Sequence, residues 1–329
     1  MRLFSLGLAL LGACTSADKP TDACDPRDAE GRAVSSADPF ARHKVSVGDD
    51  PQEFISYIDE GAGDPVIFLH GAPTSSYLWR NIIPDVARTH RAIAIDLVGY
   101  GDSGTPAASE FRYVDHVRWV TRFVEALGLQ NVTFVVHDIG SIPGFAYAAS
   151  HPDNVHALVH LESLYFPIPD ENLLPPEARF IRSADGQRAI AEDNWFIETM
   201  MPGFIERTWC AEERAHYDRP WRDPARRRVL QRVPLDLPIG GTPADSQQIF
   251  ERFGAYLMTS DVPKLLIYAE PGVLVQDTAP PGFPASIRQI VSGFPNTTTV
   301  SVGHALHFLQ EDHPRAVAAA IVAFLASHP

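Results

Sequence analysis

The sequence has few of the features that bind metals, phosphates or nucleic acids. Its 329 residues include only three cysteines, and no group of cysteines and histidines has the spacing of a metal site. It also contains no glycine-rich phosphate loop and no internal repeat. The formal net charge of -14 argues against nucleic acid and anionic membrane surfaces as partners. We therefore expect no metal, no cofactor and no nucleic-acid partner.

Long apolar runs are also missing near the start of the chain. The apolar run over residues 3–13 follows Arg2 and is far too short to span a bilayer. Small residues lead into Cys14, and residues 11–14, Leu-Gly-Ala-Cys, resemble a bacterial lipobox. We expect residues 1–13 to be a signal peptide of the lipoprotein type, with Cys14 as the lipid attachment site; an ordinary secretory signal is the alternative. The expected location is outside the cytoplasm, either periplasmic or anchored in the outer membrane.

Residues 14–42 have hardly any large apolar side chains and are rich in alanine, aspartate, serine and proline. This composition predicts a flexible tether, because such a segment buries too little apolar surface to fold. The only expected membrane contact is the lipid anchor, and the chain is expected to be a monomer. Cys24 and Cys210 can form a disulfide in an oxidising compartment or can both be free, and the sequence does not decide between these states.

What is present is a chain with 45% hydrophobic residues, long enough for one large α/β domain with an insertion. Strand-like and helix-like segments alternate with short connections, which is typical of a parallel, doubly wound sheet. The expected strands are 44–47, 53–59, 66–69, 91–97, 132–138, 155–161, 264–268 and 297–302. The expected helices are 75–86, 116–127, 284–292 and 313–327.

The alternation breaks over residues 167–244. This segment is rich in proline, arginine and tryptophan, and it has helix-like pieces such as 186–200 but no convincing strand. An insertion of this size between strands predicts a helical cap over the carboxyl edge of the sheet. The α/β core is accordingly expected over residues 43–166 and 245–329.

The stretch over residues 132–144 organises the rest of the chain. A buried apolar strand ends at Asp138, Gly140 permits a close strand-to-helix approach, and Pro143 falls in the first turn of the following helix. This is the pattern of a nucleophile elbow, which displays a reactive side chain at the ligand-binding edge of the sheet. Taken alone, an aspartate at the position of Asp138 is more often a helix N-cap than a nucleophile.

Asp138 has two partners of the right chemistry at later strand ends, Glu162 and His307. A carboxylate nucleophile suits attack on a saturated carbon, because the alkyl ester that forms can be hydrolysed. His307 would then deprotonate the attacking water, and Glu162 would orient His307. The backbone N–H groups of Ala72 and Ile139 would stabilise the oxyanion. Glu270 is a rival for the acid, and His304 is a rival for the base.

Three segments resemble the haloalkane dehalogenases of the α/β-hydrolase fold. They are residues 70–80, His-Gly-Ala-Pro-Thr-Ser-Ser-Tyr-Leu-Trp-Arg; residues 136–140, Val-His-Asp-Ile-Gly; and residues 306–312, Leu-His-Phe-Leu-Gln-Glu-Asp. The resemblance runs from about residue 39 to the C-terminus and includes the cap. It implies a mostly parallel eight-stranded sheet flanked by helices, with the cap after strand six. It is closest to the subfamily whose catalytic acid follows strand six, which supports Glu162 over Glu270.

Two positions depart from that family's pattern. In the family a tryptophan follows the nucleophile and an asparagine follows the His-Gly pair, and their side chains hold the departing halide. Here these positions are Ile139 and Ala72, whose side chains carry no donor. Losing two hydrogen bonds of about 1.5 to 3 kcal/mol each would slow carbon–halogen cleavage by orders of magnitude unless other donors replace them.

Replacement donors can be sought in the cap and the loops around it. The indoles of Trp195 and Trp209 could hold a halide, or could simply be packing residues. The sister epoxide hydrolases use a cap tyrosine or histidine to donate to the alkoxide, and Tyr165 and Tyr217 are possible donors of that kind. The expected leaving-group or substrate pocket comprises Trp195, Phe196, Trp209, Tyr165, Tyr217, Val273 and Leu274.

We therefore expect a hydrolase that forms an ester between Asp138 and a small apolar electrophile. The family resemblance implies a haloalkane dehalogenase-like reaction, in which a haloalkane and water give an alcohol and a halide. One alternative is an epoxide hydrolase that yields a vicinal diol. The other is a tethered binding protein whose catalytic site has decayed, since a fold alone does not guarantee activity.

Overall fold

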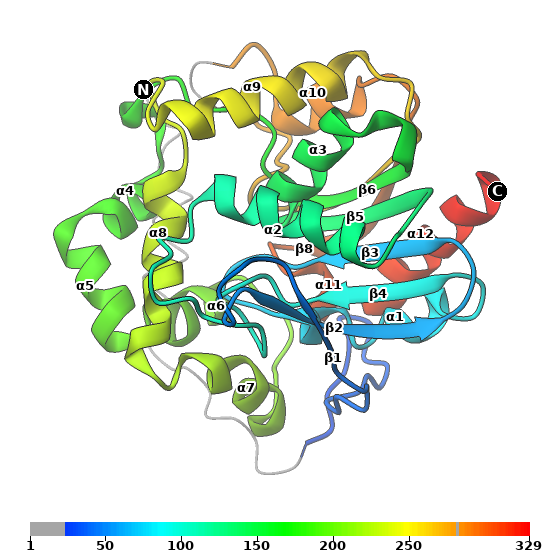
Figure 1. Ribbon diagram of the computed structural model, residues 1–329, viewed down its shortest axis with the longest axis horizontal. Helices are drawn as coiled ribbons and strands as arrows, with labels where there is room; N and C mark the ends of the chain where they lie inside the picture. The colour runs from blue at the N-terminus through cyan, green and yellow to red at the C-terminus, as the bar shows by residue number, and fades with distance from the viewer. Residues whose placement is uncertain (1–23, 281–282) are drawn as a thin grey trace.

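The computed structural model describes residues 24–280 and 283–329. Within them, eight strands form one sheet in the order β1-β2-β4-β3-β5-β6-β7-β8 (Figure 1). The β1–β2 and β2–β4 pairs are antiparallel and the other pairs are parallel, which confirms the predicted fold class. The strands are β1 (His43–Ser46), β2 (Phe54–Gly61), β3 (Pro65–Leu69), β4 (Arg91–Ile95), β5 (Val132–Asp138), β6 (Val155–Ser163), β7 (Lys264–Pro271) and β8 (Thr297–Ala305).

The central strands are apolar because helices cover both faces of the sheet. Every residue of β3 is buried, as are all residues of β5 except Asp138. One face is covered by α2 (Tyr113–Ala126), α3 (Ser141–Ser150) and α9 (Ala244–Thr259), and the other by α1 (Ile83–Val86) and α12 (Pro314–Ser327) (Figure 1). Leu69 of β3 lies in register with Val136 of β5, so the loop after β3 emerges beside the end of β5.

Two predicted helices differ from the observed ones. The predicted helix over residues 75–86 is a 3-10 turn, η1 (Ser76–Trp79), followed by the short α1, which has Pro84 in its first turn. The predicted helix over 186–200 ends early, because Asn194 adopts a left-handed conformation after α5 (Ala184–Asp193). A π-helical turn, η4 (Phe196–Met200), follows it.

A layer of short helices lies between β6 and α9 in sequence. It comprises α4 (Pro176–Arg182), α5, η4, α6 (Met201–Gly203), α7 (Ala211–Asp218) and α8 (Arg228–Asp236). In Figure 1 the helices α4, α5, α7 and α8 lie together on the left, beside the sheet. This layer meets the loops at the carboxyl ends of the strands: the Trp221 indole donates a 2.8 Å hydrogen bond to the carbonyl of Pro73. We call residues 167–243 the cap.

The structure corrects the tether prediction for residues 24–42, because these residues pack against the body of the protein. Cys24 forms a disulfide with Cys210 of the cap, and Asp28 is almost fully buried. Hydrogen bonds also hold the segment, including that from the Arg80 side chain to the carbonyl of Ser35. Polar contacts and a disulfide, rather than apolar burial, hold this segment, so its low content of large apolar residues does not leave it unpacked. The predicted signal peptide (1–13) and Cys14 lie outside the described residues.

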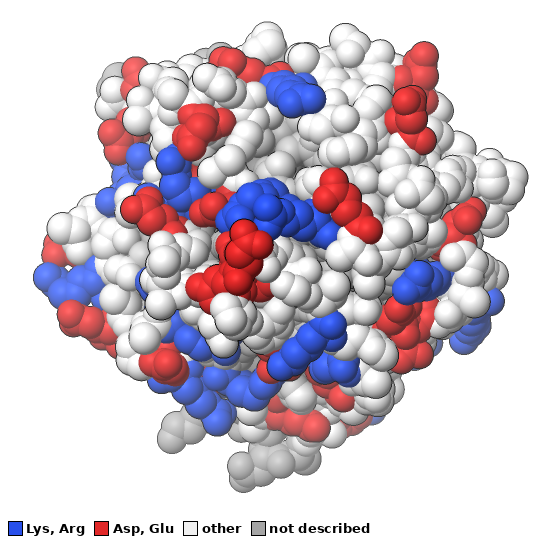
Figure 2. Space-filling view, in the orientation of Figure 1, with Lys and Arg blue, Asp and Glu red and all other residues white. Residues whose placement is uncertain are grey.

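Acidic and basic side chains are interspersed on the molecular face shown in Figure 2. Ion pairs between such side chains include Arg118 with Glu53 at 3.0 Å and Arg112 with Asp245 at 2.6 Å. No helix in the described ranges is long and apolar enough to cross a bilayer.

Candidate active site

Asp138 stands at the turn between β5 and α3. Its backbone has φ +49°, a left-handed conformation that costs a non-glycine residue on the order of 1–3 kcal/mol. Gly140 is needed in the same turn, because a Cβ atom there would lie 2.5 Å from the carbonyl oxygens of Leu69 and His70. The strained turn raises the carboxylate out of the strand, as the predicted nucleophile elbow requires.

The two oxygens of the Asp138 carboxylate have different surroundings. Oδ2 accepts a 2.9 Å hydrogen bond from the backbone N–H of Ala72. Burial raises the pKa of Asp138 above its ordinary value, while the charge of His307 and the N–H groups of Ala72 and Ile139 partly oppose that rise. Gly71 allows the loop after β3 to come this close to Asp138, because a Cβ atom at Gly71 would lie 2.5 Å from the Cβ atom of Asp138.

Glu162 and His307 meet at the same edge of the sheet. The Nδ1 atom of His307 lies 3.2 Å from Oε2 of Glu162, and both side chains are buried. Burial alone would lower the pKa of His307, but the bond to Glu162 and the charges of Asp138 and Glu162 raise it. Because Nδ1 faces a carboxylate, it carries the proton, and Nε2 is the ring atom free to accept one.

A loop after β7 holds the Glu162 carboxylate through three backbone N–H groups. Val273 and Leu274 donate to Oε2 at 2.9 and 2.7 Å, and Val275 donates to Oε1 at 3.2 Å. These three donors fix the orientation of the Glu162 carboxylate toward His307. Gly272 begins the loop with φ +65°, and a Cβ atom there would lie 2.8 Å from Oε1 of Glu162.

Glu270 and His304, the alternative candidates for the acid and the base, lie at the surface. The Glu270 side chain is 64% exposed and pairs with Arg288 at 3.2 Å. The His304 side chain is 72% exposed and pairs with Glu206 at 3.4 Å. The structure thus brings Glu162 and His307 together and leaves Glu270 and His304 at the surface.

His137 is a site residue that the sequence reasoning missed. Its Nε2 atom lies 2.9 Å from the carbonyl oxygen of His307, and the two rings lie 4.5 Å apart. Burial lowers the pKa of His137, so the ring is neutral and donates from Nε2. The bond ties the loop carrying the base to the strand carrying the nucleophile. The available signal was a histidine next to Asp138 inside a buried strand.

The two tyrosines expected as possible donors are engaged elsewhere. The Tyr217 hydroxyl donates to the carboxylate of Glu311, and the Tyr165 hydroxyl bonds Nδ1 of His160 at 2.8 Å. This corrects the expectation that either one donates to a leaving group, because neither hydroxyl is free.

The remaining expected pocket residues divide between the cap and the loop after β7. Trp195 packs between Phe180 and Phe196 in the cap. Trp209 contacts Tyr217 and lines a surface cavity beside the disulfide, so it does not join the catalytic residues. Val273 and Leu274 contribute backbone N–H groups to Glu162, a role the sequence did not indicate.

Ala72 and Ile139 contribute backbone N–H groups but no side-chain donors, and both side chains are almost fully buried. Within the described ranges, no cluster of three or more His, Cys, Asp or Glu residues could bind a metal ion. The arrangement can therefore present a carboxylate to an electrophile, and an oriented imidazole to the water that follows.

Fold and site together define an α/β hydrolase with a carboxylate nucleophile. The profile of the alpha/beta hydrolase fold family matches residues 64–314. A haloalkane dehalogenase of Sphingobium indicum is 40% identical over 281 residues, which cover 82% of this chain and 91% of the relative. One of Mesorhizobium japonicum is 37% identical over 278 residues, which cover 82% of this chain and 87% of the relative. The chain belongs to the haloalkane dehalogenase family.

Solved structures agree with this assignment. The crystal structure of an ancestral haloalkane dehalogenase superposes with a TM-score of 0.79 at 38% identity, covering 87% of this chain and 98% of the other. The haloalkane dehalogenase DatA from Agrobacterium tumefaciens gives a TM-score of 0.78 at 30% identity, covering 89% of this chain and 99% of the other.

Proposed function

We propose that the chain hydrolyses small apolar haloalkanes through an ester on Asp138. The geometry of the site supports this proposal. Asp138 lies on a strained turn at the end of β5, and Nδ1 of His307 is hydrogen-bonded to the buried carboxylate of Glu162. Its family membership supports the same reaction class.

In the first step a carboxylate oxygen of Asp138 attacks the carbon that bears the halogen. Oδ2 is held by the N–H of Ala72, so Oδ1 is the attacking atom. The carbon–oxygen bond forms as the carbon–halogen bond breaks, and the halide leaves with the bonding electrons. The product is a neutral alkyl ester whose carbonyl oxygen is Oδ2.

In the second step water attacks the carbonyl carbon of that ester. Nε2 of His307 takes a proton from the water, and Glu162 stabilises the imidazolium that forms. The negative charge develops on Oδ2, which already accepts a hydrogen bond from the N–H of Ala72, and the N–H of Ile139 also bonds the Asp138 carboxylate. The tetrahedral intermediate collapses, and the alcohol leaves with the proton from His307. The Asp138 carboxyl group then releases the remaining proton of the water to solvent, which regenerates the carboxylate.

Two substrate panels test the proposal. We expect the purified protein to release bromide from short bromoalkanes and to form the corresponding alcohols. Diols from an epoxide panel without halide release would replace the proposed reaction with epoxide opening at the same site. If neither panel gives product, the chain is a binding protein instead.

We further propose that the chain is exported and anchored through Cys14. The lipobox-like residues 11–14 support this, and the Cys24–Cys210 disulfide is typical of an oxidising compartment. Cys14→Ser should move the protein from the membrane fraction to the soluble fraction. Cys24→Ser, which breaks the disulfide but spares the lipobox, should not. Unaltered fractionation of Cys14→Ser would exclude the anchor.

A further inference from the structure

The segment over residues 24–36, which we call the strap, runs along one side of the molecule and joins the cap to the short helix α11 (Leu309–Asp312), which follows His307. At its start, Cys24 is bonded to Cys210 of the cap. Further along, the N–H of Ala29 donates to the carbonyl of Asp312 at 2.7 Å, and Glu30 pairs with His313 at 2.8 Å. The strap thus holds two parts of the chain that are about a hundred residues apart.

The same two parts also bind each other directly. The Asp312 carboxylate accepts hydrogen bonds from the N–H groups of Glu206 and Arg207, both at 3.0 Å. The N–H of Phe308 donates to the carbonyl of Phe204 at 3.3 Å, and the Phe204 ring lies 6.0 Å from that of His307. The cap segment over residues 204–213 therefore lies against the residues that follow the base.

A buried charge cluster fastens this contact. Glu311 pairs with Arg80 at 2.6 Å and also with Arg207, and Glu213 pairs with Arg80 at 2.7 Å and Arg207 at 2.6 Å. Each of these four side chains is at most 3% exposed. Burial alone would raise the pKa of Glu311, but Arg80 and Arg207 lower it to about 2. Glu213 also accepts from the N–H of Cys210, so the cluster reaches the disulfide.

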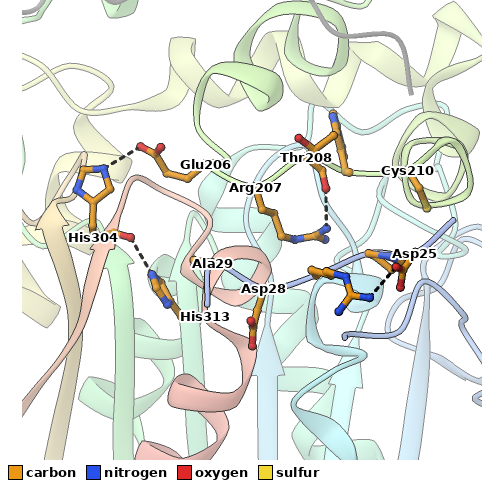
Figure 3. Close-up of a pocket in the computed structure, with 12 residues that line it drawn as sticks. Asp25, Asp28, Ala29, Glu206, Arg207, Thr208, Cys210, His304 and His313 are labelled. Atoms are coloured by element: carbon orange, nitrogen blue, oxygen red, sulfur yellow. Dashed lines mark hydrogen bonds and ion pairs between the residues drawn. The ribbon is translucent and has the colours of Figure 1, made fainter. Parts of the chain in front are cut away.

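Apolar side chains do not fill the space between the start of the strap and the cap. A cavity of about 720 Å³ lies between residues 25–29 of the strap and residues 206–210 of the cap, with His304 and His313 at its side (Figure 3). Few packed side chains can therefore hold the two segments together here, so the disulfide is the direct link at this end of the strap. At the other end, the Ser36 hydroxyl donates to the carboxylate of Glu212 of the cap at 2.7 Å.

Asp138 depends on none of these contacts. Its position comes from the turn after β5 and from the N–H groups of Ala72 and Ile139. His307 is the catalytic group one residue before Phe308 and four before Glu311, so movement of the cap segment acts on the base and not on the nucleophile.

We infer that the strap, locked by Cys24–Cys210, is a positioning element that holds His307 in place for ester hydrolysis. This inference rests on the proposed function. It assigns the residues of the strap to the second chemical step alone: loosening the strap slows the attack of water on the ester and leaves ester formation unchanged.

Pre-steady-state kinetics with a bromoalkane separate the two steps. The first turnover releases bromide in a burst that reports ester formation, and the later steady rate reports ester hydrolysis when that step limits turnover. In Cys24→Ser/Cys210→Ser we expect hydrolysis to slow about tenfold, with burst rates within about twofold of wild type, because a small misplacement of a catalytic group has effects of this size. The ester on Asp138 should accumulate and be detectable by mass spectrometry.

Dithiothreitol provides a second route that needs no variant to fold. It reduces the disulfide to two thiols and is itself oxidised, so the same wild-type sample can be measured in both states. We expect the reduced protein to behave as the double variant does, and the double variant to be insensitive to the reagent.

Equal slowing of both steps would overturn the inference, because it would indicate general destabilisation. Unchanged hydrolysis after reduction would also overturn it. A wild-type protein that forms no ester with any substrate would instead remove the proposed function, and that result is recognisable before any variant is made.

Discussion

Glu162 acts on His307 through both a hydrogen bond and its charge, and each raises the pKa of the imidazole. A base with a raised pKa becomes protonated, and therefore inactive, at a higher pH than a free imidazole. When ester hydrolysis limits turnover, kcat should fall as the pH decreases through the pKa of His307. Glu162→Gln should move this fall to lower pH and reduce the plateau of kcat by roughly 10²- to 10⁴-fold.

Glu270→Gln is the matched control for that variant, because Glu270 ends the next strand but faces solvent. Its pH profile should coincide with that of the wild type. A Glu162→Gln profile with an unshifted midpoint would mean that another group sets the pKa of His307.

Ala72 and Ile139 leave the departing halide without the side-chain donors that their family positions supply. Ile139→Trp with Ala72→Asn should raise the rate of bromide release if these donors limit the first step. The new side chains enter buried positions, so we expect a stability cost of about 1–3 kcal/mol from overpacking, measured by thermal unfolding.

Ile139→Phe with Ala72→Val separates the two effects, because it adds bulk without a donor. It should lose stability and gain no activity. An active, folded Trp/Asn variant with an unchanged rate of bromide release would show that other groups already bind the halide.

At single positions, the sequence predicted that Asp138, Glu162 and His307 lie at strand ends, and the structure places them there. Their roles as nucleophile, acid and base stay predictions. The sequence did not predict that the hydroxyls of Tyr165 and Tyr217 are occupied, because their partners, His160 and Glu311, are identified only by the folded geometry. The sequence also did not predict that the backbone N–H groups of Val273 and Leu274 bind Glu162, because a pattern of side chains does not show where a backbone N–H group points.

Among the structural elements, the loop after β7 has the most direct effect on catalysis. Gly272→Ala places a Cβ atom 2.8 Å from Oε1 of Glu162, at a residue with φ +65°. We expect the displaced loop to release Glu162 and to lower kcat by about tenfold or more, measured as steady-state alcohol formation.

Gly128→Ala controls for backbone strain, because Gly128 has φ +61° but no atom within 4 Å of the added Cβ. Both substitutions should cost about 1–2 kcal/mol of stability from the left-handed conformation alone. Only Gly272→Ala should lower kcat. Equal losses of kcat in both variants would contradict the role assigned to the loop.

The strands were predictable because buried apolar runs such as those of β5 and β6 have few alternatives. Helix ends were less predictable. The break between η1 and α1 and the left-handed Asn194 depend on local backbone geometry, which a window of apolar residues does not report.

Across the whole molecule, the cluster of Arg80, Arg207, Glu213 and Glu311 connects the core, the cap and the strap. Arg80→Met would leave Glu213 and Glu311 with Arg207 as their only remaining arginine partner in this cluster. Removing one partner from a buried pair costs about 3–5 kcal/mol, which should appear as a lower midpoint in urea unfolding.

Arg188→Met is the surface counterpart, because Arg188 pairs with Asp185 on an exposed helix face. Such pairs contribute about 0–1 kcal/mol, so its unfolding midpoint should hardly change. A midpoint for Arg80→Met equal to that of Arg188→Met would show that the buried cluster does not stabilise the fold.

The alternation of segments and its interruption over residues 167–244 predicted a core and a helical cap, and the structure has short helices in that interruption. The docking of the strap did not, because composition reports how much apolar surface a segment can bury and nothing about polar partners elsewhere. Ala29 and Asp312 are far apart in the sequence, and only the fold places their backbones together.

All of the proposed chemistry depends on the transient ester on Asp138. A single turnover in water labelled with heavy oxygen tests whether this ester forms. With protein in excess over a bromoalkane, the product oxygen should come from the Asp138 carboxylate. We therefore expect unlabelled alcohol and a labelled peptide containing Asp138. Labelled alcohol in that first turnover, with an unlabelled Asp138, would contradict it, because water would then have attacked the substrate directly.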